Sequence, residues 1–185
     1  DSNLFHDIDV PGIGLIQGNL SGPIRVQRSD PYLNAATGLT CIDTEIVSMT
    51  LTGIDPVAGT VVMTLDPCRP SKGQICEQVA GTCFPADSFF DVFVVVQLKD
   101  LGICLYACAP AHMKTVIDRT PPLGALYNID LGPGQVLPLY KGPCMEQCDP
   151  AVDPCRQQPL PAPAAFIIKA VHQPLPPKQC DCFPK

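Results

Sequence analysis

The stretch TEIVSMTLTG, residues 44–53, decides the fold class because its apolar and hydroxyl side chains alternate. One face is formed by Val47, Met49 and Leu51, and serine and threonine side chains form the other. A period of two is typical of a β-strand with one buried face. After a turn rich in glycine and proline, the run GTVVMTL at 59–65 has the composition of an antiparallel partner.

The run FFDVFVVVQL at 89–98 is apolar on both faces and rich in β-branched and aromatic residues. Such a run favours a strand in the middle of a sheet assembly. Nearer the start of the chain, residues 14–18 and 24–28 flank the turn sequence at 21–23. We expect these two segments to pair as a hairpin.

Further short strands are expected at 103–108, 135–140 and 164–171, whereas 111–118 fits either a strand or one to two helical turns. The pattern amounts to about eight or nine short strands and no long helix. It predicts an all-β, disulfide-rich β-sandwich or jelly-roll-like domain with long loops and a proline-rich C-terminal tail.

Eleven cysteines are unusual for a chain of 185 residues, which is long enough to bury a core without them. The sequence has no CxxC or CxxCH motif, which argues against a thioredoxin-type site and c-type haem attachment. The CxxxC pairs at 104/108 and 144/148 could bind a metal, but an exported chain favours disulfides. The disulfide candidates are Cys41, Cys68, Cys76, Cys83, Cys104, Cys108, Cys144, Cys148, Cys155, Cys180 and Cys182.

An odd number of cysteines leaves at least one sulfur unpaired within the chain. It would either bond another molecule or remain a free buried thiol, and the connectivity of the rest does not follow from the sequence. In the segment GPCMEQCDPAVDPC, residues 142–155, prolines favour an extended path that cysteines then fix. We therefore expect a β-sandwich core with an N-terminal arm in 1–141. In 142–185 we expect a cysteine- and proline-rich loop, the last strand and the tail, packed on the same domain.

Charge and hydropathy limit the classes of partner that the chain could bind. The net charge is −6 and no basic run occurs, which argues against a nucleic-acid partner. The longest apolar run is too short to span a membrane as a helix. The chain starts at Asp1 rather than methionine, so we expect an exported protein with its signal peptide removed, located outside the cell or at its surface.

Candidate chemistry is sparse. No G-x-S-x-G motif and no phosphate-binding glycine loop occur, so we expect no enzymatic activity. His6, Asp7 and Asp9 place an imidazole and two carboxylates within four residues and could bind calcium or a transition metal; otherwise this is a solvated segment. No other cofactor is expected. Asn19 begins an N-glycosylation sequon.

Four segments carry a resemblance: FFDVFVVVQL, HMKTVIDRTPPLGALYN, VLPLYK and AFIIKAVH. They resemble a set of uncharacterised exported bacterial all-β, cysteine-rich proteins, over roughly residues 42–172. The resemblance implies export and an all-β fold. It implies no activity and no catalytic residues.

Only 16% of the residues are charged, which is low for a dissolved monomer. We therefore expect a structural subunit of an extracellular assembly (a filament, sheath, coat or matrix) that contacts other copies of itself. Apolar packing, disulfides and exchange of an arm, either 1–20 or 172–185, would hold the copies together. One alternative is a monomeric secreted binding module for a glycan, a protein or calcium. Another is a hydrolase or a cysteine-based redox enzyme.

Overall fold

Antiparallel pairing joins fourteen strands into one sheet in residues 1–175, the part of the chain that the computed structural model describes. Two short 3-10 helices, η1 (Lys99–Leu101) and η2 (Pro154–Arg156), accompany them. The strands are β1 (Ser2–Val10), β2 (Gly14–Gly22), β3 (Ile24–Arg28), β4 (Tyr32–Leu33), β5 (Thr40–Asp55), β6 (Gly59–Leu65), β7 (Ser71–Glu77), β8 (Ala86–Val92), β9 (Val94–Leu98), β10 (Ile103–Ala107), β11 (Ala111–Ile117), β12 (Tyr127–Ile129), β13 (Leu137–Gly142) and β14 (Ala165–Pro174).

The sheet closes on itself because β1 pairs with β2 on one side and with β14 on the other. Some consecutive strands lie end to end and pair with the same neighbouring strand; β6 and β7, for example, both pair with β5. We call each such row of strands, or a strand that spans the sheet alone, a course. Within residues 1–175 the sheet therefore has eight courses, which are β1, β2–β3, β5, β6–β7, β8–β9, β10–β11, β12–β13 and β14. A closed sheet of this size has an interior that side chains just fill, or that holds one small ligand.

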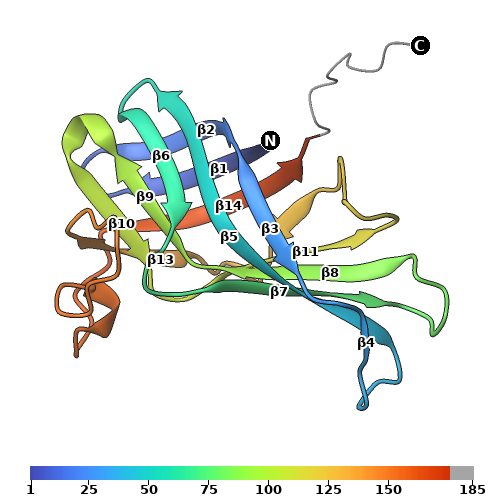
Figure 1. Cartoon of the computed structure of the whole chain (residues 1–185). Helices are drawn as coiled ribbons and strands as arrows, with labels where there is room; N and C mark the ends of the chain where they lie inside the picture. Colours follow the sequence, from blue (N-terminus) through green and yellow to red (C-terminus); the bar gives the residue numbers. More distant parts are fainter. Residues whose placement is uncertain (176–185) are drawn as a thin grey trace, which may run out of the picture.

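The predicted all-β, disulfide-rich class is confirmed. The pair predicted from 44–53 and 59–65 is also confirmed, with Thr50 opposite Thr64. The segment 111–118, which the sequence left open, is the strand β11. The alternation of side chains did not predict that the sheet closes into one barrel (Figure 1).

One face assignment in β5 is wrong. Val47 was expected beside Met49 and Leu51, but it is 44% exposed and Ile46 takes the inward position at 7%. The pairing with β3 shifts register here, since Arg25 lies opposite Ser48 and the next residue lies opposite Ile46. Val47 is the extra residue of this bulge, and a bulge reverses the side on which later residues lie.

The predicted hairpin of 14–18 with 24–28 is also wrong. Instead, β2 pairs with β1, and β3 continues the same course along β5. Pro23, which joins the two strands, accepts a hydrogen bond from Thr50 N at 3.2 Å. Gly22 lies so close to the Thr50 carbonyl that a Cβ would collide with it. The glycine and proline therefore produce a bend over β5 rather than a reversal.

At one end of the barrel, which we call the packed half, β6, β9, β10 and β13 enclose a filled interior with parts of β1, β2, β5 and β14 (Figure 1). Each of its central side chains is at most 2% exposed. Burying one such side chain stabilises the fold by about 1.5–3 kcal/mol. These side chains are Ile8, Ile16, Leu51, Leu98, Leu105, Leu139 and Ile167.

Residues 143–156, which we call the brace, cover the outer face of β9 and β10. Tyr106 and Val95 point outward beneath it and pack against Met145 and Cys155. The Tyr106 hydroxyl donates to the Pro143 carbonyl and accepts from Met145 N at 3.1 Å. This second, small core exists because the brace shields side chains that would otherwise face solvent.

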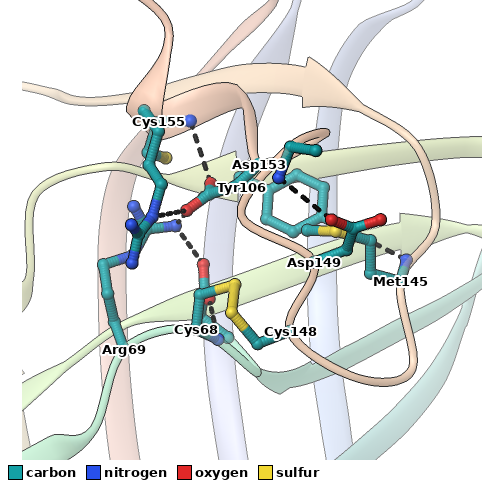
Figure 2. Close-up of a disulfide and its surroundings, with 11 residues drawn as sticks. Cys68, Arg69, Tyr106, Met145, Cys148, Asp149, Asp153 and Cys155 are labelled. Atoms are coloured by element: carbon teal, nitrogen blue, oxygen red, sulfur yellow. Dashed lines mark hydrogen bonds and ion pairs between the residues drawn. A yellow bond between two sulfur atoms is a disulfide. The ribbon is translucent and has the colours of Figure 1, made fainter.

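Three disulfides fix the brace: Cys104–Cys144, Cys108–Cys155 and Cys68–Cys148. Figure 2 shows the last of them, Cys68–Cys148. The CxxxC pairs are thus not metal ligands, because each of their cysteines bonds a partner elsewhere. A fourth disulfide, Cys41–Cys76, joins directly opposite residues of β5 and β7. Within residues 1–175 Cys83 forms no disulfide and is exposed. Cys180, Cys182 and most of the expected C-terminal arm lie outside the described residues.

The brace is anchored where several strands are interrupted. The interruptions are 66–70 between β6 and β7, Phe93 between β8 and β9, and 108–110 between β10 and β11; together we call them the bend line. Asp66 N donates to the Phe93 carbonyl at 2.9 Å, so two interruptions lie side by side. The bend line separates the packed half from the rest of the barrel.

Buried charge reinforces this junction. Asp153 is 2% exposed, caps η2 by accepting from Cys155 N at 3.0 Å, and lies 3.5 Å from the Arg69 guanidinium. Arg69 also pairs with the buried Asp66 and lies over the Phe93 ring at 5.5 Å. Removing one partner would leave a buried charge unpaired, so this group specifies how the brace docks.

Candidate functional site

The other half of the barrel, which we call the hollow half, contains a cavity of about 490 Å³. It is enclosed by β3, β7, β8, β11 and β12 with parts of β1, β5 and β14. Its walls are mainly aliphatic and aromatic, including Ile46, Met49, Phe90 and Met113. A volume of this size lies within the range of about 300–1,000 Å³ typical of small-molecule sites.

Residue size and strand path together explain the space. Ala111 and Ala170 occupy inward positions of β11 and β14, and their methyl groups fill little of the interior. Beyond the bend line, β7, β8 and β11 extend away from the packed half (Figure 1). The walls are therefore too far apart, and too lightly filled, to close on one another.

The cavity opens where β1 begins and β14 ends, since Ser2 and Pro174 are directly opposite each other. Its rim includes Arg28, Pro121 and Leu123, all of which are exposed. The rim thus combines the charged side chains of Asp1 and Arg28 with apolar surface, whereas the interior is almost entirely apolar.

Three polar atoms interrupt the apolar walls: Nδ1 of His6, Nε2 of His172 and Oγ1 of Thr44. Each is buried and has no hydrogen-bond partner among residues 1–175. The fourth such atom in the described residues, Nε of Arg69, lies near the brace. Leaving a buried polar group unpaired costs about 1–3 kcal/mol, so such groups in a cavity point to a missing partner.

His6 and His172 lie on adjacent strands of the same wall. Leu4 is opposite His172 and His6 is opposite Ala170, so the two histidines are diagonal neighbours. Burial lowers the pKa of His6, with Asp7 and Asp55 acting in the opposite direction. Burial also lowers the pKa of His172 to about 4. Both imidazoles are therefore neutral at neutral pH, and each has one donor and one acceptor nitrogen.

Tyr127 extends the polar part of this wall. Its ring centroid lies 6.0 Å from that of His172 and 5.8 Å from that of Phe90. Its hydroxyl is paired with Ser88 Oγ at 2.8 Å, and burial raises the pKa of the phenol. Tyr127 is thus a protonated, satisfied group that fixes the ring beside His172.

The metal candidate His6, Asp7 and Asp9 is divided between two faces. His6 is 3% exposed and lines the cavity, whereas the carboxylates alternate to the outside. Side chains of β1 alternate between the two faces of the strand, so His6 and the two carboxylates do not share one face. Across residues 1–175 no group of three or more histidine, cysteine or acidic side chains is placed to bind a metal. Asn19 is exposed on β2, and its glycosylation stays a prediction.

A second set of titratable groups lies on the outer surface of β8, β11 and β12. His112 Nδ1 is 2.7 Å from Asp91 Oδ1, and Lys114 Nζ is 2.5 Å from Asp130 Oδ2. All four side chains are 39% exposed or more. Pairs in this setting contribute little to stability and mark a solvated face.

Sequence reasoning missed His172, Thr44 and Tyr127 as cavity residues. A signal was available in β1 and β14, where His6 and His172 interrupt an otherwise apolar inward row. In a strand whose inward positions are aliphatic, a histidine among them is an exception that merits attention.

The comparisons with known proteins agree with this fold. The profile of the family of unknown function DUF6073 matches residues 4–146, and the chain belongs to that family. The chain is also similar to the structure of DynF from the dynemicin biosynthesis pathway of Micromonospora chersina. The TM-score is 0.73 at 22% identity, over 95% of this chain and 79% of that one. No curated protein matches the chain.

Proposed function

We propose that this member of the DUF6073 family binds one small, largely apolar molecule inside the hollow half of its barrel. The observation that supports it most is the cavity of about 490 Å³, whose apolar walls contain three polar atoms without partners in the described residues. Sites of this kind, mostly apolar with a few placed polar groups, are typical of small-molecule binding. This proposal keeps the monomeric binding module that the sequence left as an alternative, but replaces its expected glycan, protein or calcium ligand with a small apolar molecule.

The likeness to DynF supports the fold alone, because the two chains are 22% identical. DynF itself comes from a biosynthesis pathway, which is compatible with binding of a metabolite. Binding without catalysis is part of the proposal, since the groups that face the cavity are neutral hydrogen-bonding side chains rather than a nucleophile paired with a base.

Titration with the neutral fluorescent probe N-phenylnaphthylamine tests the proposal. Ala170→Phe places a ring inside the cavity, and we expect it to weaken probe binding at least about tenfold without unfolding the barrel. Ala80→Phe, in an exposed turn, is the matched control and should bind the probe like the unchanged protein. Failure of the unchanged protein to bind the probe, or equal binding by both variants, would contradict the proposal.

Export and self-assembly remain proposals from the sequence. The four disulfides fit an oxidising compartment. In the part of the chain that the structure describes, no helix is long and apolar enough to cross a membrane. The expected N-terminal arm, residues 1–20, forms β1 and most of β2. Strand β1 is hydrogen-bonded to β2 and to β14, so exchange of the arm between copies would first break strand pairings within the barrel. Particle sizing of concentrated protein and non-reducing electrophoresis test assembly.

A further inference from the structure

We propose that the molecule in the cavity is uncharged and presents a hydroxyl or carbonyl group to His6 and His172. This inference rests on the proposed function. The remainder of the ligand would be apolar and would occupy the space between these histidines and the β5, β8 and β11 walls.

The position of the two histidines supports a single polar contact point. As diagonal neighbours on the inner face of β1 and β14, they have Cα atoms separated by about 7–8 Å. His6 and His172 both line the cavity, and Nδ1 of His6 and Nε2 of His172 are buried without a partner in residues 1–175. One oxygen-bearing group placed between the two rings can satisfy both nitrogens.

The charges around the cavity argue for a neutral ligand. Among the described residues that line it, the side chains charged at neutral pH are Asp1 and Arg28, and both are exposed at the rim. The interior groups that titrate are His6, His172 and Tyr127, and all are neutral at neutral pH. A carboxylate or ammonium placed beside the histidines would be buried without a countercharge, which is costly.

The unpaired imidazole nitrogens of His6 and His172 indicate which neutral group the ligand carries. A neutral imidazole offers one donor and one acceptor, so a hydroxyl can satisfy either atom and a carbonyl can accept from a donor. A hydrocarbon would leave both nitrogens unpaired. Thr44, on the β5 wall, offers a further hydroxyl to a second polar group of the ligand.

Competition against bound N-phenylnaphthylamine tests this inference with a series of equal chain length: dodecanol, dodecanone, dodecanoate, dodecylammonium and dodecane. We expect dodecanol or dodecanone to displace the probe at concentrations about tenfold lower than the other three, because they alone pair the imidazoles without burying a charge. Equal displacement by the alcohol, the ketone and the hydrocarbon would overturn the inference, and so would preference for either ion.

Variants locate the contact. His6→Phe and His172→Phe keep a flat ring but remove the nitrogens, and each should reduce the advantage of the alcohol over the hydrocarbon about threefold or more while probe binding persists. His112→Phe changes the third histidine, which lies on the outer surface, and should leave the series unchanged. Retention of the full advantage in both cavity variants would overturn the inference.

Two further readouts separate the outcomes. If dodecanoate binds best, the inference fails although the cavity still binds ligands, and Arg28→Gln shows whether the carboxylate pairs with Arg28 at the rim.

If the probe does not bind at all, the proposed function fails and this inference fails with it. If a histidine variant does not fold, imidazole NMR shifts of the unchanged protein decide: dodecanol must shift the ring signals of His6 and His172, and unshifted signals overturn the inference.

Discussion

The packed half and the hollow half of the barrel are built from the same courses of chain but differ in what fills them. In the packed half, Leu98, Leu105 and Leu139 are fully buried and belong to one core cluster. In the hollow half the same courses enclose about 490 Å³, and Ala111 and Ala170 are among the inward residues. A closed sheet thus fixes a diameter, and residue size and strand bending decide whether it becomes a core or a site.

The disulfides are divided between the two halves and the boundary between them. The brace joins β10 and the bend line through three disulfides, whereas Cys41–Cys76 joins β5 and β7 in the hollow half. Because Cys68 and Cys108 both lie in interruptions of the strands, two disulfides of the brace hold the bend itself. Covalent cross-links therefore secure the place where the barrel changes from filled to empty.

The largest expected effect comes from removing the brace disulfide at the bend line. Cys68→Ser with Cys148→Ser opens a cross-link that spans 80 residues in sequence, and should lower the free energy of unfolding by about 2–4 kcal/mol. Hydrogen exchange should accelerate first at the bend line, at the amide of Asp66, which donates to the Phe93 carbonyl, and at the amide of Phe93, which donates to Ser71 Oγ. Denaturant unfolding and exchange mass spectrometry measure the two effects.

The matched control is Cys41→Ser with Cys76→Ser. Its faster exchange should appear in β5 and β7 near the changed residues, because that disulfide joins directly opposite positions of those strands. The same exchange pattern in both double variants would contradict a special role of the brace at the bend.

Acid should weaken the hollow half through His172. Its pKa is about 4 in the folded protein and near 6.5 in the unfolded chain. The unfolded chain therefore binds more protons below pH 6.5, and the free energy of unfolding should fall as the pH drops from about 6.5 to about 4, then level off for this group. The loss reaches at most about 3 kcal/mol.

Denaturant titrations at a series of pH values measure this loss, and His172→Phe should flatten the profile between pH 6.5 and 4. His112→Phe, on the exposed surface, should leave the profile as it is. A profile of His172→Phe that matches the unchanged protein would show that this imidazole is not the group responsible.

The smallest effect compares one substitution in each half. Ala107 on β10 is fully buried in the packed half, and Ala107→Leu should destabilise the fold by about 1–3 kcal/mol through overpacking. Ala111→Leu adds the same side chain beside the cavity and should change stability by less than about 1 kcal/mol while weakening probe binding. Equal destabilisation by both would mean that the hollow half is closed in solution.

The candidate site shows where sequence reasoning ends. The sequence marked His6 only as part of a short metal candidate within the N-terminal arm. Neither its buried position nor its neighbour His172, which is 166 residues away in sequence, followed from that pattern. The pairing of β1 with β14 brings the two histidines together, and pairing between chain ends leaves no local signal.

By itself the sequence determined many of the strands, though not β1 or β7, because alternation, β-branched runs and glycine and proline turns act within a few residues. It also determined that most cysteines would cross-link rather than bind metal. The tertiary structure alone decided the closure of the sheet, the partner of each bonded cysteine, the outward turn of Val47 at its bulge and the presence of a cavity. These features depend on contacts between residues far apart in the chain, where register and packed volume, rather than local preference, set the outcome.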